Sequence, residues 1–137
     1  MRNLTGDIMP INILVADDKE RMISEEIELK ERFGNNIYFA RTVADVDRLL
    51  NEREYAVAIA DPLELHTIPA FMEYFLVSER VRHVLFTIKN KGVPLIFAAS
   101  EFTKEQLQLE QGKHYDVIHA KPYNVAQLVE QIELLTS

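Results

Sequence analysis

The chain has 137 residues, of which 47% are hydrophobic and 27% charged, and it contains no cysteine. This length is that of one ordinary domain, which can bury a hydrophobic core without covalent cross-links. The absence of cysteine excludes disulfides, thiolate zinc sites and cysteine nucleophiles. With 15 Lys and Arg against 22 Asp and Glu, the formal net charge is -7, which argues against a nucleic-acid-binding protein because such a protein carries a basic face.

Residues 1–9 are predicted to be a short N-terminal extension, and residues 10–137 to form the domain. The extension lacks a basic start and a long apolar run, so it does not have the pattern of a signal peptide. No apolar run elsewhere reaches the length of a membrane span. We therefore expect a cytoplasmic protein without membrane contact, and we expect no separate output domain because the last predicted helix ends close to Ser137.

The first half of the chain alternates predicted strands and helices. Residues 11–16 (INILVA) are almost wholly apolar and rich in β-branched side chains, which predicts a strand buried on both faces. Apolar residues then recur among charges at helical spacing over residues 21–33, and Gly34 marks the end of that helix. The other elements of this half are a strand over residues 37–40, a helix over 43–50 and a strand over 55–60.

The second half begins with a long apolar segment over residues 70–88, which predicts a lengthened third helix. At its start, residues 70–77 (AFMEYFLV) are apolar on more than the one side that packs on a sheet. The extra apolar residues either pack on the domain's own core or form a surface for a homodimer or another protein. The remaining predicted elements are a strand over residues 93–99, a short helix from Thr103 to about Gly112, a strand over 116–120 and a helix capped by Asn124.

This alternation predicts an α/β fold, a doubly wound parallel sheet of five strands with helices on both faces. Ligands of such sheets bind beyond the carboxyl ends of the strands. The residues that follow the predicted strands are Asp17 and Asp18 after the first, Asp61 after the third, Ser100 after the fourth and Lys121 after the fifth. We therefore expect these side chains to converge on one edge of the sheet.

The chemistry of this edge is coherent. Carboxylates that lie close together repel each other unless a cation or a proton intervenes. Mg²⁺, a hard ion that prefers oxygen ligands, is the usual cation where phosphate is handled, and a lysine ammonium such as that of Lys121 suits phosphoryl oxygens. A carboxylate that faces both is equipped to form an aspartyl-phosphate intermediate.

Four motifs occur in order at the predicted strand ends: ILVADD, AVAIAD, PLIFAAS and the triplet Lys121-Pro122-Tyr123. With them the sequence resembles the receiver domain of two-component response regulators over nearly the whole chain. The resemblance implies a flavodoxin-like sheet of strand order 2-1-3-4-5 with five helices. It also implies a histidine kinase or phosphotransfer protein as phosphodonor and a downstream protein as partner.

The resemblance also assigns roles to residues. It implies that Asp61 is the phosphoacceptor, and that Asp61, Asp17, Asp18 and the backbone carbonyl of Leu63 bind Mg²⁺. It implies that Lys121 contacts the phosphoryl group, and that the peptide bond between Lys121 and the following proline is cis.

The sequence also departs from the family. The family usually has Thr or Ser as the last residue of the fourth strand, where this chain has Ala99, followed by Ser100. Ser100 is either the displaced site hydroxyl or an ordinary turn residue. The switch aromatic of the family, three residues before the lysine, corresponds to Ile118, and the segment between Asp61 and Pro94 is longer than usual. We therefore expect the phosphorylation chemistry to be intact, and the conformational coupling between the phosphorylation site and the binding surface to be altered.

Other interpretations of the single residues remain open. Asp17 and Asp18 could cap the first helix, Asp61 could open a turn, and Lys121 could be a solvated loop residue. The histidines show no spacing of metal ligands, and His119, within a strand pattern, is interpreted as a packed or hydrogen-bonded residue.

Three functions are considered for the whole chain. The first is a stand-alone receiver, which is not an enzyme beyond its own phosphorylation and dephosphorylation. The second is a pseudo-receiver or scaffold that associates through residues 70–88 whatever its phosphorylation state. The third is a small phosphatase with an aspartate nucleophile, which is disfavoured because no second aspartate follows Asp61 at short spacing.

Overall fold

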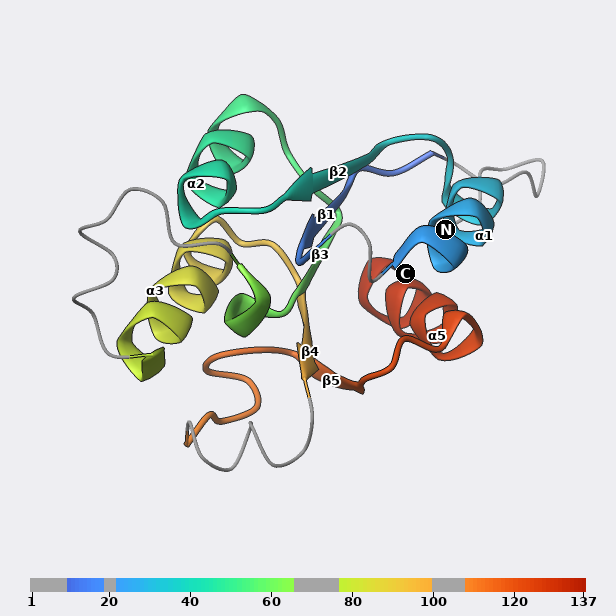
Figure 1. Ribbon diagram of the computed structural model, residues 1–137. Coiled ribbons are helices and arrows are strands. Elements are labelled where there is room, and N and C mark those ends of the chain that lie inside the picture. The colour runs from blue at the N-terminus through green and yellow to red at the C-terminus, as the bar shows by residue number, and fades with distance from the viewer. Residues whose placement is uncertain (1–9, 19–21, 66–76, 100–107) are drawn as a thin grey trace.

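The computed structural model describes residues 10–18, 22–65, 77–99 and 108–137. The sheet has five parallel strands in the order β2-β1-β3-β4-β5, with helices on both faces (Figure 1), which confirms the predicted fold. The strands are β1 (Ile13–Ala16), β2 (Ile37–Ala40), β3 (Val57–Ala60), β4 (Leu95–Ala99) and β5 (Val117–Ala120). The helices are α1 (Ile23–Phe33), α2 (Val43–Glu52), the 3-10 helix η2 (Pro62–Glu64), α3 (Val77–Asn90) and α5 (Val125–Thr136).

Two hydrophobic layers cover the sheet, one on each face. Figure 1 shows α2 and α3 on one face and α1 and α5 on the other. Successive residues of a strand serve opposite layers: in β1, Leu14 belongs to the α2 and α3 layer, and Ile13 and Val15 to the α1 and α5 layer. The residues of β1, β3 and β4 are all buried, which explains their continuous apolar sequences. None of the helices in the described part of the chain is long and apolar enough to cross a membrane.

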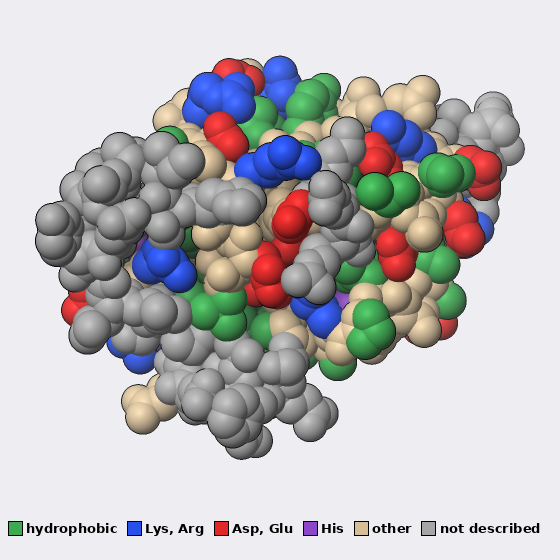
Figure 2. Space-filling view, in the orientation of Figure 1, with side chains coloured by type: hydrophobic (Ala, Val, Ile, Leu, Met, Phe, Trp, Pro, Cys, Tyr) green, Lys and Arg blue, Asp and Glu red, His purple; other side chains and the backbone are tan. Residues whose placement is uncertain are grey.

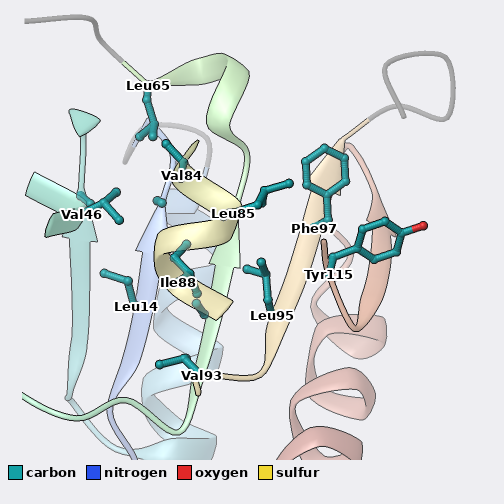
Figure 3. Packing of buried hydrophobic residues seen from close by; sticks show 14 of the residues in the cluster. Leu14, Val46, Leu65, Val84, Leu85, Ile88, Val93, Leu95, Phe97 and Tyr115 are labelled. Carbon is teal, nitrogen blue, oxygen red and sulfur yellow. The ribbon is translucent and has the colours of Figure 1, made fainter. Parts of the chain in front are cut away.

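Helix α3, Val77–Asn90, packs on the domain's own core. Val81, Val84, Leu85 and Ile88 of α3 have no exposed surface. Figure 3 shows Val84, Leu85 and Ile88 lying over the strands. On the outer side of α3, Phe86 is 67% exposed. From Val81 onward the apolar residues of α3 other than Phe86 therefore serve the core, while residues 70–76, like the extension 1–9, lie outside the described residues.

The helix predicted from Thr103 to about Gly112 is wrong over residues 108–112. Gln108 has a positive φ of 53°, and Gln111 forms an isolated parallel bridge with Tyr115. The Gly112 N–H donates to the Tyr115 carbonyl at 2.7 Å. These backbone groups pair with the segment just before β5, so they are not available to a helix; residues 103–107 lie outside the described part.

Gly34 ends α1, as predicted. It has a φ of 95°, and its N–H donates to the Lys30 carbonyl at 2.9 Å. A Cβ atom at this position would lie 3.0 Å from Cβ of Pro10, at the entry to β1. Both the backbone conformation and the close approach of Pro10 therefore require glycine.

We expect Gly34→Ala to lower the free energy of unfolding by about 1–2 kcal/mol for the left-handed backbone, and further for the contact with Pro10. Gly92→Ala is the matched control, because Gly92 also has a positive φ, 75°, but a Cβ there would meet nothing within 4 Å. Urea unfolding of both variants measures the difference. Equal losses would show that the Pro10 contact costs nothing.

His119 of β5 is fully buried and joins β5 to α5. Its Nδ1 lies 3.0 Å from Oε1 of Gln131, and its Nε2 accepts the N–H of Asn124 at 3.0 Å. Asn124 is the N-cap of α5, where its side chain accepts the Gln127 N–H. These contacts fit a neutral imidazole with its proton on Nδ1, because Nε2 must be an acceptor. His119 is thus a packed and hydrogen-bonded residue, as expected.

Stability is expected to fall as the pH decreases below the ordinary histidine pKa of 6.5, because burial lowers the pKa of His119 in the folded chain. In the interval between the lowered pKa and 6.5 the unfolded chain binds more protons, so lowering the pH favours unfolding. We expect the free energy of unfolding to drop less in His119→Gln than in wild type between about pH 7.5 and about pH 5.5. Urea titrations at both pH values measure this drop, and identical drops would contradict the assignment.

Candidate functional site

The carboxyl ends of β1, β3 and β5 bring three predicted site residues together: Asp17, Asp61 and Lys121. Backbone hydrogen bonds continue one residue past the strands: the Asp17 N–H donates to the carbonyl of Ala40, and the Asp61 N–H to that of Ala16. The side chains of the two aspartates therefore leave the sheet at fixed positions. Figure 2 shows acidic side chains in the middle of this face, with a basic side chain beside them.

Lys121 bridges the two aspartates. Its Nζ lies 2.9 Å from Oδ2 of Asp17 and 2.8 Å from Oδ2 of Asp61. Asp17 has no exposed surface, Asp61 is 4% exposed, and the Lys121 side chain is 15% exposed. The interpretation of Lys121 as a solvated loop residue is therefore wrong, and its ammonium is the central contact of the site.

Asp17 receives two further hydrogen bonds. The Tyr123 hydroxyl donates to Oδ2 at 2.5 Å, and the Asp18 N–H donates to Oδ1 at 2.6 Å. This role of Tyr123 is not predicted from the sequence, in which Tyr123 is only the aromatic residue of the Lys-Pro-aromatic triplet. The sequence shows only that Tyr123 carries a hydroxyl donor, and the carboxylate that this donor reaches depends on the fold.

Asp61 has a second, local role as the N-cap of η2. Its Oδ1 accepts the Leu63 N–H at 3.2 Å, within the turn that starts at Pro62. The turn-opening interpretation of Asp61 is therefore confirmed, and its other carboxylate oxygen, Oδ2, contacts Lys121. The same turn fixes the backbone of Leu63, whose carbonyl is the predicted metal ligand, next to the site.

The helix-capping interpretation of Asp17 and Asp18 is wrong for α1. The N-cap position of α1 is occupied by Met22, and no side chain forms a hydrogen bond as its cap. Asp17 instead binds Lys121 and Tyr123, and Asp18 is half-buried beside it.

Burial sets the ionisation of the site. It raises the pKa of Asp61, although the hydrogen bond from Lys121 acts in the opposite direction. Burial disfavours the charged form of Lys121, but its hydrogen bonds with Asp61 and Asp17 outweigh this effect and raise the lysine pKa. Burial and the Asp17 carboxylate raise the pKa of Tyr123, so the phenol remains a donor. A desolvated carboxylate is also a stronger base and nucleophile than a hydrated one.

The end of β4 contributes a methyl group. Ala99 is 3% exposed, and its carbonyl accepts the Lys121 N–H at 3.3 Å. Ser100, the candidate for a displaced site hydroxyl, lies outside the described residues. Ile118 is half-buried opposite Phe97 in the sheet. The bond between Lys121 and Pro122 is cis, as the resemblance implies.

The donor set suits a hard divalent cation. Asp17, Asp18 and Asp61 carry three negative charges against the single positive charge of Lys121, which leaves a formal charge of about -2 on oxygen donors. Within the described ranges, no three acidic or histidine side chains are already arranged around a metal position. In this arrangement the ammonium of Lys121 lies against both Asp17 and Asp61, so a metal ion would share these carboxylates with it.

No protein-family model and no curated protein sequence matches the chain. Solved structures do. The Francisella response regulator 1452 receiver domain is 19% identical, with a TM-score of 0.63 over 92% of this chain and 96% of that one. The chemotaxis response regulator CheY4 of Vibrio cholerae is 17% identical, with a TM-score of 0.66 over 92% of this chain and 98% of that one.

A third similar structure is the receiver domain of the sensor histidine kinase PA1611 from Pseudomonas aeruginosa. It is 15% identical, with a TM-score of 0.65 over 93% of this chain and 98% of that one, and its structure holds a magnesium ion in the active site cleft. The chain therefore has the fold of a response regulator receiver domain.

Proposed function

We propose that the chain is a phosphoacceptor receiver of two-component signalling, in which Asp61 accepts a phosphoryl group from a histidine kinase or phosphotransfer protein. The observation that carries the proposal is the 2.8 Å contact between Oδ2 of Asp61 and Nζ of Lys121, in a buried site with excess negative charge. A buried carboxylate beside an ammonium is suited to attack phosphorus, because the ammonium can then neutralise a phosphoryl oxygen.

In the proposed reaction, a carboxylate oxygen of Asp61 attacks the phosphorus of a phosphohistidine. The P–O bond forms, the P–N bond breaks, and the histidine nitrogen of the donor keeps the electron pair. Lys121 exchanges its contact with Asp61 for one with the phosphoryl group, and its ammonium is then shared between Asp17 and that group. The carboxylates of Asp17, Asp18 and Asp61 and the Leu63 carbonyl would hold Mg²⁺, which when bound supplies positive charge to the phosphoryl oxygens.

Phosphorylation would add about two negative charges to this site, and it can act only by shifting an equilibrium between conformations. A downstream protein partner would bind one of these conformations more tightly. The chain has Ala99 and Ile118 where the family has a hydroxyl and an aromatic residue. The conformational change that follows phosphorylation would therefore differ from the one that the resemblance implies.

The second candidate is a pseudo-receiver or scaffold, and the methyl group of Ala99 at the end of β4 favours it. Its expected binding surface is reduced, because α3 directs Val81, Val84, Leu85 and Ile88 into the core. This candidate predicts that Asp61 stays unmodified and that partners bind whatever the phosphodonor.

The first test is the intact mass of the full chain after incubation with a small acyl phosphate and Mg²⁺. We expect one added phosphoryl group in wild type and in Asp47→Asn, which removes an aspartate of α2 outside the site. We expect none in Asp61→Asn or without Mg²⁺, because both the nucleophile and the neutralising charge are needed. A folded wild-type protein that takes up no phosphoryl group would overturn the receiver proposal in favour of the scaffold.

Removing the bridging ammonium tests the electrostatics of the site. In Lys121→Met, two buried carboxylates lose their cation, and we expect the free energy of unfolding to fall by about 3–5 kcal/mol. Added Mg²⁺ should restore part of this loss, because it binds only the folded chain. Thermal and urea unfolding with and without Mg²⁺ measure both effects.

Lys89→Met is the matched control for this variant. Lys89 contacts Asp116 at 2.7 Å, but its side chain is 24% exposed, so the pair is screened by water. We expect a loss of about 1 kcal/mol, without restoration by Mg²⁺. Equal losses in the two variants would show that burial of the Lys121 site carries no special cost.

A further inference from the structure

Tyr123 is buried next to the proposed phosphorylation site, and its hydroxyl shares a carboxylate oxygen with Lys121. Tyr123 is 8% exposed, and its hydroxyl lies 2.5 Å from Oδ2 of Asp17. Nζ of Lys121 lies 2.9 Å from the same oxygen. The other oxygen of Asp17 accepts the Asp18 N–H at 2.6 Å. The Asp17 carboxylate thus has three donors and no exposed surface.

We propose that Tyr123 is a positioning residue that acts through Asp17 and limits the affinity of the site for Mg²⁺. The inference deepens the proposed function and rests on it for its purpose, but the hydrogen bond itself does not depend on phosphorylation. The hydroxyl withdraws negative charge from Asp17 Oδ2, so an entering cation competes with it for the carboxylate.

The position of the hydroxyl is set by the connection between β5 and α5. The Tyr123 ring stacks on His119, with centroids 5.5 Å apart and an angle of 28° between the planes. His119 in turn accepts the N–H of Asn124, the N-cap of α5. The Lys121 ammonium lies 5.1 Å from the Tyr123 ring centroid, on the same connection. The donor therefore reaches Asp17 from a ring that is already held in place.

The hydroxyl of Tyr123 also holds Asp17 when Lys121 moves. If Lys121 moves toward a phosphoryl group, Asp17 loses part of its charge compensation, and the hydroxyl of Tyr123 remains as a second donor on Oδ2. Asp17 then keeps its position on the strand end without a full ammonium contact. A phenylalanine would fill the same space but could not do this.

The test is isothermal titration of the full chain with Mg²⁺ alone, in wild type and in Tyr123→Phe. We expect Mg²⁺ to bind about three- to tenfold more tightly to Tyr123→Phe, because its Asp17 carboxylate is less compensated. The control is Tyr115→Phe, a tyrosine that is 4% exposed and stacks on Phe97 in the other hydrophobic layer. Its affinity for Mg²⁺ should equal that of wild type.

An unchanged or weaker affinity in Tyr123→Phe would overturn the inference, since a ring that only fills space leaves Mg²⁺ binding alone. Absence of Mg²⁺ binding in wild type would overturn it as well. Should Tyr123→Phe fail to fold, the NMR chemical shift of Tyr123 Cζ in wild type provides the test. We expect it to change during a titration with Mg²⁺, because the hydroxyl and the cation share the Asp17 carboxylate. An unchanged chemical shift would contradict the inference. A wild-type chain that binds Mg²⁺ with this dependence on Tyr123, but gains no phosphoryl group, would support the inference and overturn the proposed function.

Discussion

The buried ion pair of Lys121 with both Asp17 and Asp61 is the interaction on which the rest of the site depends. Burying charges costs several kcal/mol per ion, and the cost is offset only when the geometry is good and the remaining hydrogen-bonding capacity is used. Here the other carboxylate oxygens accept backbone N–H groups of Asp18 and Leu63. Each aspartate is therefore stabilised from its own loop as well as from Lys121, and the strand ends are held at a fixed separation.

The same interaction leaves the site short of positive charge. One ammonium compensates two buried carboxylates, and Asp18 adds a third carboxylate beside them. A cation or a proton lowers this excess, and burial already raises the pKa of Asp61 toward protonation. The placement of these charges thus supports the proposed binding of a divalent cation, and in that proposal the hydroxyl of Tyr123 competes with the cation for Asp17.

The fold and most of the site follow from local patterns in the sequence. Continuous apolar runs identify the buried strands, and the rule that parallel strands present their carboxyl ends at one edge places Asp17, Asp61 and Lys121 together. Two features could not be predicted in this way. The turn at residues 108–112 depends on pairing between Gln111 and Tyr115, and the bond from Tyr123 to Asp17 joins residues 106 positions apart. Apolar periodicity contains no information about such contacts, because they depend on where a polar atom lies after folding.

The direction in which the site can act on the rest of the molecule follows from its hydrogen bonds. At the end of β4, the described residue beside the site is Ala99, whose methyl group can neither donate nor accept. On the side of β5, polar and aromatic contacts continue from Asp17 through Tyr123 to His119, and from His119 to the N-cap and the middle of α5. In the proposed reaction, a displacement of Lys121 changes the charge balance on both Asp61 and Asp17, and the contacts of Asp17 with Tyr123 and of Tyr123 with His119 connect it to the N-cap of α5. Within the described part of the chain, side-chain contacts thus connect the acidic site to α5 through Tyr123 and His119, and to η2 through the cap that Asp61 forms.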